Sequence, residues 1–327
     1  MSVANTTLIE DEYEAAMADP RNHRILDVAP EIDPSTGLHA PQLSDAELEH
    51  FEREGFIVLG RVAPPENIKA MCERIDDIMM GRVVLPNPAL FQLCPSAEDL
   101  PHYAEHGGAQ TKVWKGATLR YRKVQDLEQD LLYLEYMGLP IFRDVTKKII
   151  AEEVSLYRTM FFNKPAMTDE ATKARGASGV VINWHQDGNP AKGSGWGLTI
   201  DPKITVWTAL DDCTIENGAL QILPRSHKFP INADGDQLSP EERPIHAPVE
   251  KRRFVLLKRG EVIVLHNWML HRSEVNSTPN PRRGFSVCYI DAATSLHSVA
   301  PEERGTKPLW PRIFPIFEPA TQEEVDG

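Results

Sequence analysis

The stretch Asn183-Trp184-His185-Gln186-Asp187-Gly188 places an imidazole and a carboxylate two positions apart. In a β-strand, residues i and i+2 point to the same side, so His185 and Asp187 can bind one metal ion while Gln186 faces away. Because the chain has 11 histidines among 327 residues, about one His-x-Asp is expected by chance. The motif therefore predicts a metal site only together with its context.

A third ligand must come from elsewhere in the chain, and two histidines are candidates. His266 ends an apolar stretch that predicts a buried strand, whereas His271 is followed by Arg282. Two histidines and one carboxylate on one face of a metal are typical of non-heme Fe(II) oxygenases. An α-keto acid that chelates such a metal leaves its far carboxylate in need of a fixed cation, and arginine supplies a bidentate charge that persists when buried. We therefore predict His271 as the ligand, with His266 as the alternative and Arg283 as the rival anchor, since strand alternation lets only one of the two arginines face inward.

The composition is that of an ordinary globular protein with 41% hydrophobic and 25% charged residues. The formal net charge of −13, without a compact basic run, argues against nucleic acid and anionic membranes as partners. The four cysteines form no CxxC pair, which favours reduced thiols over a zinc site or a disulfide framework. The sequence has neither the pattern of a signal peptide nor an apolar run of transmembrane length, and we expect a cytoplasmic protein.

The first half of the chain predicts helices behind an extended arm. Residues 1–42 are acidic and broken by prolines, which indicates the arm. Ser44 and Glu47 form a capping box that opens a helix, and Gly55 ends that helix. The helical part, residues 43–152, is predicted to contain helices over residues 44–54, 65–80, 125–136 and 140–152, with a long loop over residues 83–118.

The pattern changes to short strands after residue 153. Strands are predicted over residues 154–163, 180–187, 204–211, 219–223, 253–257, 261–266 and 283–290, with the hairpin signal Asn217-Gly218 between two of them. Helices followed by seven or eight strands predict an α+β fold with a mainly β core. This core, residues 153–291, would be a double-stranded β-helix of the jelly-roll or cupin-like type, backed by the N-terminal helices. Residues 43–299 would form a single domain, and residues 300–327 a Pro-rich tail.

Several short stretches occur together in one order between residues 123 and 290. They are KVQD at 123–126, TMFFNKP at 159–165, HQD at 185–187, VWTAL at 206–210, NGALQILP at 217–224, SHK at 226–228, His271-x-Ser273 and Arg282. In this combination the chain resembles the phytanoyl-CoA dioxygenase (PhyH) family of Fe(II)- and 2-oxoglutarate-dependent oxygenases.

The resemblance implies a role for each matching residue. His185, Asp187 and His271 would bind Fe(II), and Arg282 would bind the far carboxylate of 2-oxoglutarate. Lys123, Met160 and Trp207 fall at positions where family members line the co-substrate site, with a surface lysine and two core residues as the alternatives. Gln186 would lie beside the metal and could bond a carboxylate.

The resemblance also implies a reaction that consumes O2 and 2-oxoglutarate and releases succinate and CO2. We predict hydroxylation of a small-molecule substrate such as a secondary metabolite, and leave desaturation, epoxidation and cyclisation open. The presence of Asp187 argues against halogenation. The alternatives are an acyl-CoA 2-hydroxylase of the phytanoyl-CoA type and a jelly-roll protein that binds a metal or small ligand without turnover. The oligomeric state is left open.

Two arginines depart from the family pattern. Arg225 and Arg272 stand where family members commonly have glycine, and Arg272 directly follows the predicted ligand His271. One hypothesis is that one of them meets an anionic or carbonyl group of the substrate, and the alternative is a solvated arginine.

Overall fold

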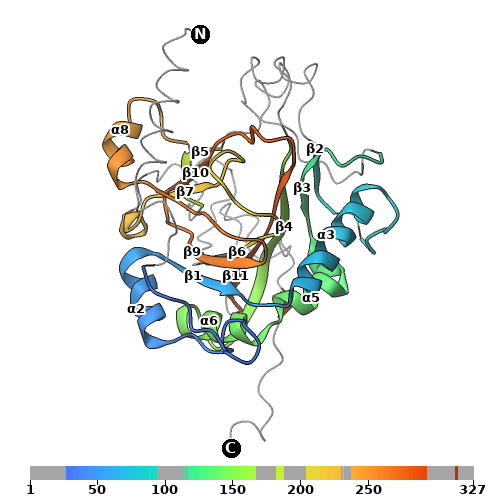
Figure 1. Cartoon of the computed structure of the whole chain (residues 1–327), viewed down its shortest axis with the longest axis horizontal. Helices are drawn as coiled ribbons and strands as arrows, with labels where there is room; N and C mark the ends of the chain where they lie inside the picture. Colours follow the sequence, from blue (N-terminus) through green and yellow to red (C-terminus); the bar gives the residue numbers. More distant parts are fainter. Residues whose placement is uncertain are drawn as a thin grey trace, which may run out of the picture.

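The computed structural model describes residues 27–87, 89–93, 114, 116–166, 182–187, 204–229, 231, 237–292 and 314–315. Within these ranges the chain forms two antiparallel sheets and a set of helices (Figure 1). This arrangement confirms the predicted jelly roll. Among the helices described, none combines the length and the apolar character needed to cross a lipid bilayer.

The larger sheet has eight strands in the order β1-β9-β6-β11-β4-β3-β2, and its last strand, β12, pairs with β4. Its strands are β1 Phe56–Arg61, β2 Phe91–Leu93, β3 Tyr121–Gln125, β4 Val154–Lys164, β6 Ile204–Ala209, β9 Glu261–His266, β11 Arg282–Asp291 and β12 Phe314–Pro315. Neighbouring strands therefore come from distant parts of the sequence, which brings residues from both halves of the chain onto one surface.

The smaller sheet has four strands in the order β5-β10-β7-β8. They are β5 Ile182–His185, β7 Leu220–Ile222, β8 Arg253–Phe254 and β10 His271–Ser273. The strand β10 was not predicted as a separate strand, because three residues are too few to show an alternating pattern.

The helices follow the capping signals of the sequence. The helix α2 Asp45–Glu54 begins after Ser44, which forms the predicted capping box with Glu47, and ends at Gly55 in the left-handed conformation with φ 85°. The remaining helices are α3 Pro65–Met79, α5 Leu131–Met137, α6 Pro140–Ile149, the short α8 Arg243–His246 and the 3-10 turns Leu127–Gln129, Ser226–Lys228 and Val249–Lys251.

One predicted helix, residues 125–136, is shorter in the structure. Asp126 has φ 64°, and the Leu127 amide donates to the Thr159 hydroxyl at 2.8 Å, so the backbone turns away from β3 before any helix can begin. The helix α5 starts only after Asp130, whose carboxylate accepts from the amide of Leu132 at 3.1 Å. The predicted loop over residues 83–118 also contains β2, a strand of only three residues.

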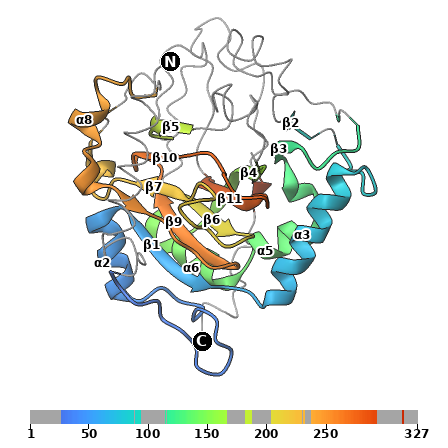
Figure 2. The ribbon, with the colours of Figure 1, turned by 45° about the horizontal axis from the view of Figure 1, so that its top comes forward.

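Alternation along the larger sheet divides its side chains between two hydrophobic clusters. On β1, Ile57 and Leu59 pack in one cluster with the helices α3, α5 and α6. Phe56 and Val58 point the other way and pack in a second cluster with residues of the smaller sheet such as Ile222. Figure 2 shows the same layering, with α3, α5 and α6 beyond the larger sheet and β5, β10 and β7 on its other side. The space between the two sheets is where the predicted site residues converge.

The two predicted terminal segments are described only in part. Residues 1–26 of the arm lie outside the described ranges, and within residues 27–42 a single bridge joins Ile32 to His39. Of the predicted tail, only β12 is described. Its Phe314 pairs with Leu156 of β4.

Candidate active site

His185 and His271 face each other across the smaller sheet. His185 ends β5, His271 begins β10, and the two are paired in the sheet register with their ring centroids 4.2 Å apart. Asp187 follows two residues after His185. One ligand atom from each of these three side chains lies within 4.8 Å of the others. The three residues can therefore donate two nitrogens and one oxygen to a single metal ion.

Hydrogen bonds determine which nitrogen of each imidazole ring faces the other ligands. The Nδ1 atom of His185 lies 2.8 Å from the carbonyl oxygen of Asn183, and the Nδ1 atom of His271 lies 2.9 Å from that of Met269. A carbonyl only accepts, so each Nδ1 carries the proton, and each Nε2 keeps its lone pair for another ligand. The His185 Nε2 atom lies 3.6 Å from Asp187 Oδ1.

The electrostatic environment shifts the pKa values of the three ligand side chains in different ways. Burial and the neighbouring His185 lower the pKa of His271 to about 4, so that this ring is neutral. Burial alone would lower the pKa of His185, but the Asp187 carboxylate outweighs it and the pKa is raised. Burial alone would raise the pKa of Asp187, but the hydrogen bond with His185 and the charge of Arg158 hold it well below its usual value. A neutral imidazole and an ionised carboxylate are the forms that bind a cation.

The alternative ligand, His266, lies in a different environment. Its ring stacks on Phe51 of α2, with centroids 6.1 Å apart, and its Nδ1 atom accepts from the Trp268 amide at 3.0 Å. It belongs to β9, which pairs with β1 and β6 and not with the strands of His185 and His271. The arrangement therefore favours His271 over His266.

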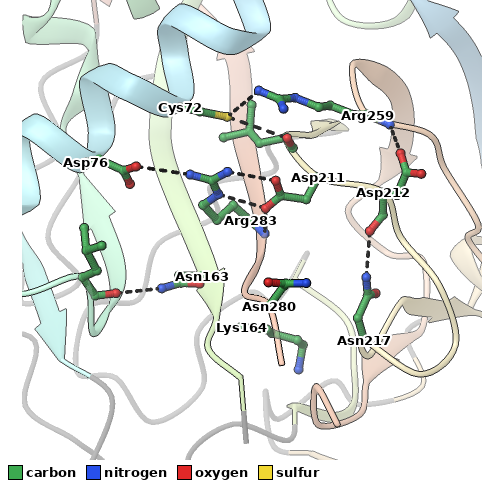
Figure 3. A network of polar contacts seen from close by, with 12 residues as sticks. Cys72, Asp76, Asn163, Lys164, Asp211, Asp212, Asn217, Arg259, Asn280 and Arg283 are labelled. Carbon is green, nitrogen blue, oxygen red and sulfur yellow. Dashed lines mark hydrogen bonds and ion pairs between the residues drawn. The ribbon is translucent and has the colours of Figure 1, made fainter. Parts of the chain in front are cut away.

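Adjacent arginines on β11 point to opposite faces of the sheet. Arg283 faces α3, where its guanidinium bonds both carboxylate oxygens of Asp211 at 2.9 Å and approaches Asp76 at 3.5 Å (Figure 3). Arg282 faces the smaller sheet, is only 5% exposed and lies with its guanidinium carbon 5.5 Å from the centre of the Trp207 ring. Arg283, the rival anchor, is thus neutralised by acidic residues, whereas Arg282 has no ion pair with any acidic residue that the structure describes.

The guanidinium of Arg282 has a hydrogen-bond donor that no described residue accepts from. Its Nη2 donates to the Gly218 carbonyl at 2.9 Å, but its buried Nε has no hydrogen-bond partner in the described part of the chain, and neither has the buried hydroxyl of Ser286 on the same face of β11. Buried donors are normally paired, so these two indicate a bound acceptor. Each of them can donate to a carboxylate oxygen.

The other predicted co-substrate residues lie on the same face of the larger sheet. Met160 of β4 and Trp207 of β6 flank Ser286 in the register, and both side chains are buried. Lys123 of β3 pairs with Phe162 of β4, and its Nζ atom lies 5.0 Å from the centre of that ring. Burial, together with the charges of Arg122 and Arg158, lowers the pKa of Lys123 to about 8.

Gln186 lies between the proposed metal ligands His185 and Asp187 in the sequence, but its side chain forms hydrogen bonds with backbone groups. Its amide nitrogen donates to the carbonyls of Ser226, Phe229 and Trp268, and its amide oxygen accepts from the Ile231 amide at 2.8 Å. This side chain ties together the segments that follow β7 and β9.

Arg225 and Arg272, one of which was hypothesised to meet the substrate, both have acidic partners within the chain. Arg225 makes three hydrogen bonds with Glu54 of α2, at 2.8 to 3.1 Å, and its side chain is 65% exposed. Arg272 pairs with Glu274 at 2.8 Å and stacks on Trp184 at 5.4 Å. These contacts favour structural roles, because each guanidinium already has an acidic partner.

Sequence reasoning missed one residue of the site, Arg158. It lies on β4 two residues before Met160 and therefore on the same face. Its Nη2 atom lies 3.4 Å from Asp187 Oδ2 and 3.4 Å from the Cys288 sulfur. The stretch that resembles the family begins at Thr159, one residue too late. Strand alternation extended backwards from Met160 was the signal that could have found it.

Comparison with known proteins supports the same assignment. The family model of phytanoyl-CoA dioxygenase (PhyH) matches residues 51–284. A curated relative, phytanoyl-CoA dioxygenase 1 of Oryza sativa subsp. japonica, is 26% identical over 77% of this chain and 90% of its own length. The phytanoyl-CoA dioxygenase of Arabidopsis thaliana is 23% identical over 76% of this chain and 89% of its own length.

Two solved structures share the fold. EctD from S. alaskensis, crystallised with 2-oxoglutarate and 5-hydroxyectoine, has a TM-score of 0.58 and 17% identity, over 91% of this chain and 90% of that one. The α-ketoglutarate-dependent carbocyclase SnoK from nogalamycin biosynthesis has a TM-score of 0.56 and 16% identity, over 84% of this chain and 96% of that one. Since the PhyH model covers most of the chain, and since His185, Asp187 and His271 converge in the structure, the chain belongs to the phytanoyl-CoA dioxygenase family of Fe(II)- and 2-oxoglutarate-dependent dioxygenases.

Proposed function

We propose that His185, Asp187 and His271 bind the Fe(II) ion, that Arg282 binds 2-oxoglutarate, and that the protein hydroxylates a small-molecule substrate. The observation that carries this proposal is the convergence of three ligand atoms within 4.8 Å between the sheets, on the side that Arg282 faces with an unpaired Nε. Iron with 2-oxoglutarate and O2 supplies the oxidation, while one oxygen atom goes to the substrate and the other to succinate, with release of CO2.

The chain's own residues prepare the metal ligands. The carbonyls of Asn183 and Met269 hold the Nδ1 protons of the two histidines, which leaves Nε2 as the metal-binding atom of each ring. The low pKa of His271 keeps it ready to bind at neutral pH. The raised pKa of His185 means that metal binding there displaces a proton, so the metal and the proton compete for this ring.

The larger sheet would bind and orient the co-substrate. The Nε and one Nη group of a guanidinium can bind the two oxygens of a carboxylate in parallel, and the Nε of Arg282 has no partner among the residues that the structure describes. Met160 and Trp207 form an apolar wall that excludes water from the same region, which strengthens the interaction between the carboxylate and the arginine. Lys123 supplies a second positive group on the neighbouring strand β3.

A second candidate, 2-hydroxylation of an acyl-CoA thioester, is favoured by the curated relatives, which are named as phytanoyl-CoA dioxygenases. The first candidate is favoured by the small ligand found with the similar EctD structure. The two differ in their substrates and are separated by measuring succinate release with acyl-CoA thioesters against panels of free small metabolites.

The test of the proposed site is an anaerobic titration of the apo protein with Fe(II) and then 2-oxoglutarate. The readout is the visible metal-to-ligand charge-transfer band of a chelated keto acid. We expect the band in the wild type and in His266→Ala, and no band in His271→Ala or Asp187→Ala. His266→Ala is the matched control, because it removes a nearby histidine that stacks on Phe51 instead.

Two outcomes would contradict the proposal. Absence of the band in a folded wild type would exclude chelation of 2-oxoglutarate by an iron in this chain. Loss of the band in His266→Ala, with retention in His271→Ala, would show that the third ligand is the other histidine.

A further inference from the structure

The side chain of Arg158 lies beside the proposed metal site, and few of its hydrogen-bond donors are engaged by the described residues. Within the described ranges, its hydrogen-bonding contacts are to Asp187 and Cys288, and both measure 3.4 Å, which is longer than the roughly 2.7 to 2.9 Å of a charge-assisted bond. Its Nε atom is buried without a partner in the described part of the chain. A guanidinium has five N–H donors, so most of its capacity is left for another molecule.

The position of Arg158 separates it from the 2-oxoglutarate anchor. On the inner face of β4 and β11, Lys164 pairs with Arg282 at one end, and Arg158 pairs with Cys288 at the other. Six residues of strand span roughly 20 Å. Arg282 and Arg158 therefore serve opposite ends of the site, with Met160, Ser286 and Trp207 in the row between them.

Arg158 is also reachable from outside. Its side chain is 30% exposed, and that of Asp187 is 29% exposed, whereas Arg282 is buried. Arg158 and Asp187 are therefore both accessible to a small molecule.

The charges around the site leave a positive excess. An Fe(II) ion, the Asp187 carboxylate and the 2-oxoglutarate dianion carry one net negative charge together. Lys123, Arg158 and Arg282 carry three positive charges when protonated. The other described cations of this face have partners in the chain, since Lys164 donates to the carbonyl of Glu274. A positive excess at a partly buried site favours the entry of another anion.

We propose that Arg158 binds a carboxylate of the prime substrate and so selects anionic small molecules. This inference rests on the proposed function, since it assumes that the metal and 2-oxoglutarate occupy the site described above. A planar guanidinium matches the two oxygens of a carboxylate, and the Asp187 charge that Arg158 faces in the free chain is shared with the metal once a metal is bound.

The experiment measures binding without turnover. The wild type is loaded with Zn(II) and 2-oxoglutarate, and saturation-transfer NMR gives the affinities of matched pairs, benzoate with benzamide and hexanoate with hexanamide, together with phenyl phosphate. The variants are Arg158→Gln, Arg158→Lys and Arg120→Gln. The last is a control that removes one positive charge at an exposed site. The anaerobic Fe(II) and 2-oxoglutarate charge-transfer titration is run on every variant.

We expect the wild type and Arg120→Gln to bind at least one acid roughly tenfold more tightly than its amide. Arg158→Gln should lose this preference, Arg158→Lys should retain part of it, and 2-oxoglutarate affinity should stay within about twofold in both. This combination separates substrate recognition from a role in positioning Asp187, because a positioning residue would change the charge-transfer titration.

Several results would overturn the inference. Equal affinity for acid and amide, binding of neither, or an acid preference that survives Arg158→Gln would each remove it, and binding of phenyl phosphate alone would exclude a carboxylate. A loss of 2-oxoglutarate affinity in Arg158→Gln that matches the loss of acid binding would assign the residue to the metal site instead. A wild type without a charge-transfer band would contradict the proposed function itself, and the inference with it.

Discussion

Neighbouring arginines on β11 provide a direct test at the scale of single residues. Arg282→Gln should weaken 2-oxoglutarate binding roughly 10- to 100-fold, since a charge-assisted pair is worth about 1.5 to 3 kcal/mol, and should leave Fe(II) binding nearly unchanged. Arg283→Gln should leave 2-oxoglutarate affinity unchanged but lower the free energy of unfolding, because Asp211 and Asp76 would lose their half-buried partner. Charge-transfer titration and urea unfolding separate the two effects. The reverse pattern would identify Arg283 as the anchor.

The pKa of Lys123 predicts a pH dependence for co-substrate binding. Burial, with Arg122 and Arg158 nearby, lowers this pKa to about 8, so the ammonium is charged below that pH and neutral above it. The affinity for 2-oxoglutarate should therefore fall as the pH rises from 7 to 9. In Lys123→Arg the charge persists, and the affinity should stay flat over this range. An equally steep fall in both proteins would show that another group is responsible.

The residues of the site differed in how far the sequence could reveal them. His185 and Asp187 are adjacent enough for strand alternation to place both on one side, and Arg282 follows from the need of a keto acid for a cation. Gln186 was harder, since nothing in the sequence says that Ser226, Phe229 and Trp268 would surround its amide. The same holds for Arg225, whose partner Glu54 lies 171 positions away. Contacts between distant segments depend on the sheet order, which a pattern along the chain does not contain.

At the scale of elements, the first turn of α2 contains a buried ionised carboxylate. Burial alone would raise the pKa of Glu47, but hydrogen bonds from His39 and Ser44 lower it to about 2. Its unfolded value is 4.5, so the unfolded chain binds the proton first as the pH falls. The stability that Glu47 contributes is therefore present above pH 4.5 and is lost as the pH falls towards 2.

We expect Glu47→Gln to lower the free energy of unfolding by roughly 2 to 3 kcal/mol at pH 7. The difference from the wild type should shrink as the pH falls from about 4.5 to about 2. Urea unfolding across this range measures it, and Glu49→Gln on the exposed side of the same helix is the matched control. A difference that does not change with pH would show that the carboxylate is not ionised in the folded protein.

On β11, Gly284 makes room for the ring that covers the site. A Cβ atom at this position would lie 2.2 Å from Trp207 Cζ2, and no positive φ contributes to the requirement. Gly284→Ala should therefore displace Trp207 from Arg282, cost about 1 to 3 kcal/mol of stability and weaken 2-oxoglutarate binding. Tryptophan fluorescence and charge-transfer titration measure both. Gly138→Ala, where the added carbon meets only ordinary contacts at 3.5 Å or more, should be nearly neutral.

The elements themselves were predictable where their signals are local. The capping box of α2, the proline at the start of α3 and the long strands β4 and β11 follow from adjacent residues. The strands β2 and β10 are each three residues long, too short to show a period, and exist because neighbouring strands supply hydrogen bonds. The turn at Asp126 likewise depends on Thr159 of β4, which no helix signal could indicate.

At the scale of the whole molecule, the proposed site joins the two sheets. The metal ligands belong to the smaller sheet and the segment after β5, whereas Arg282, Met160, Trp207 and Lys123 belong to the larger sheet. A metal alone would stabilise mainly the smaller sheet. A 2-oxoglutarate molecule that chelates the metal and binds Arg282 would connect both layers, and each ligand stabilises the folded state by mass action.

The melting temperature of the protein should therefore rise with 2-oxoglutarate only after a metal is bound. Zn(II) should raise the melting temperature, 2-oxoglutarate alone should leave it unchanged, and 2-oxoglutarate added at about 100 times its Kd to the Zn(II) form should add about 2.7 kcal/mol, or about 4 °C for a chain of this size. Arg282→Gln should keep the increment from Zn(II) and lose about half or more of the one from 2-oxoglutarate at the same concentration. His271→Ala should lose both, because the keto acid then has no metal to chelate. If 2-oxoglutarate stabilised His271→Ala as much as the wild type, its binding would not depend on the metal, and the two sheets would not be joined through this site.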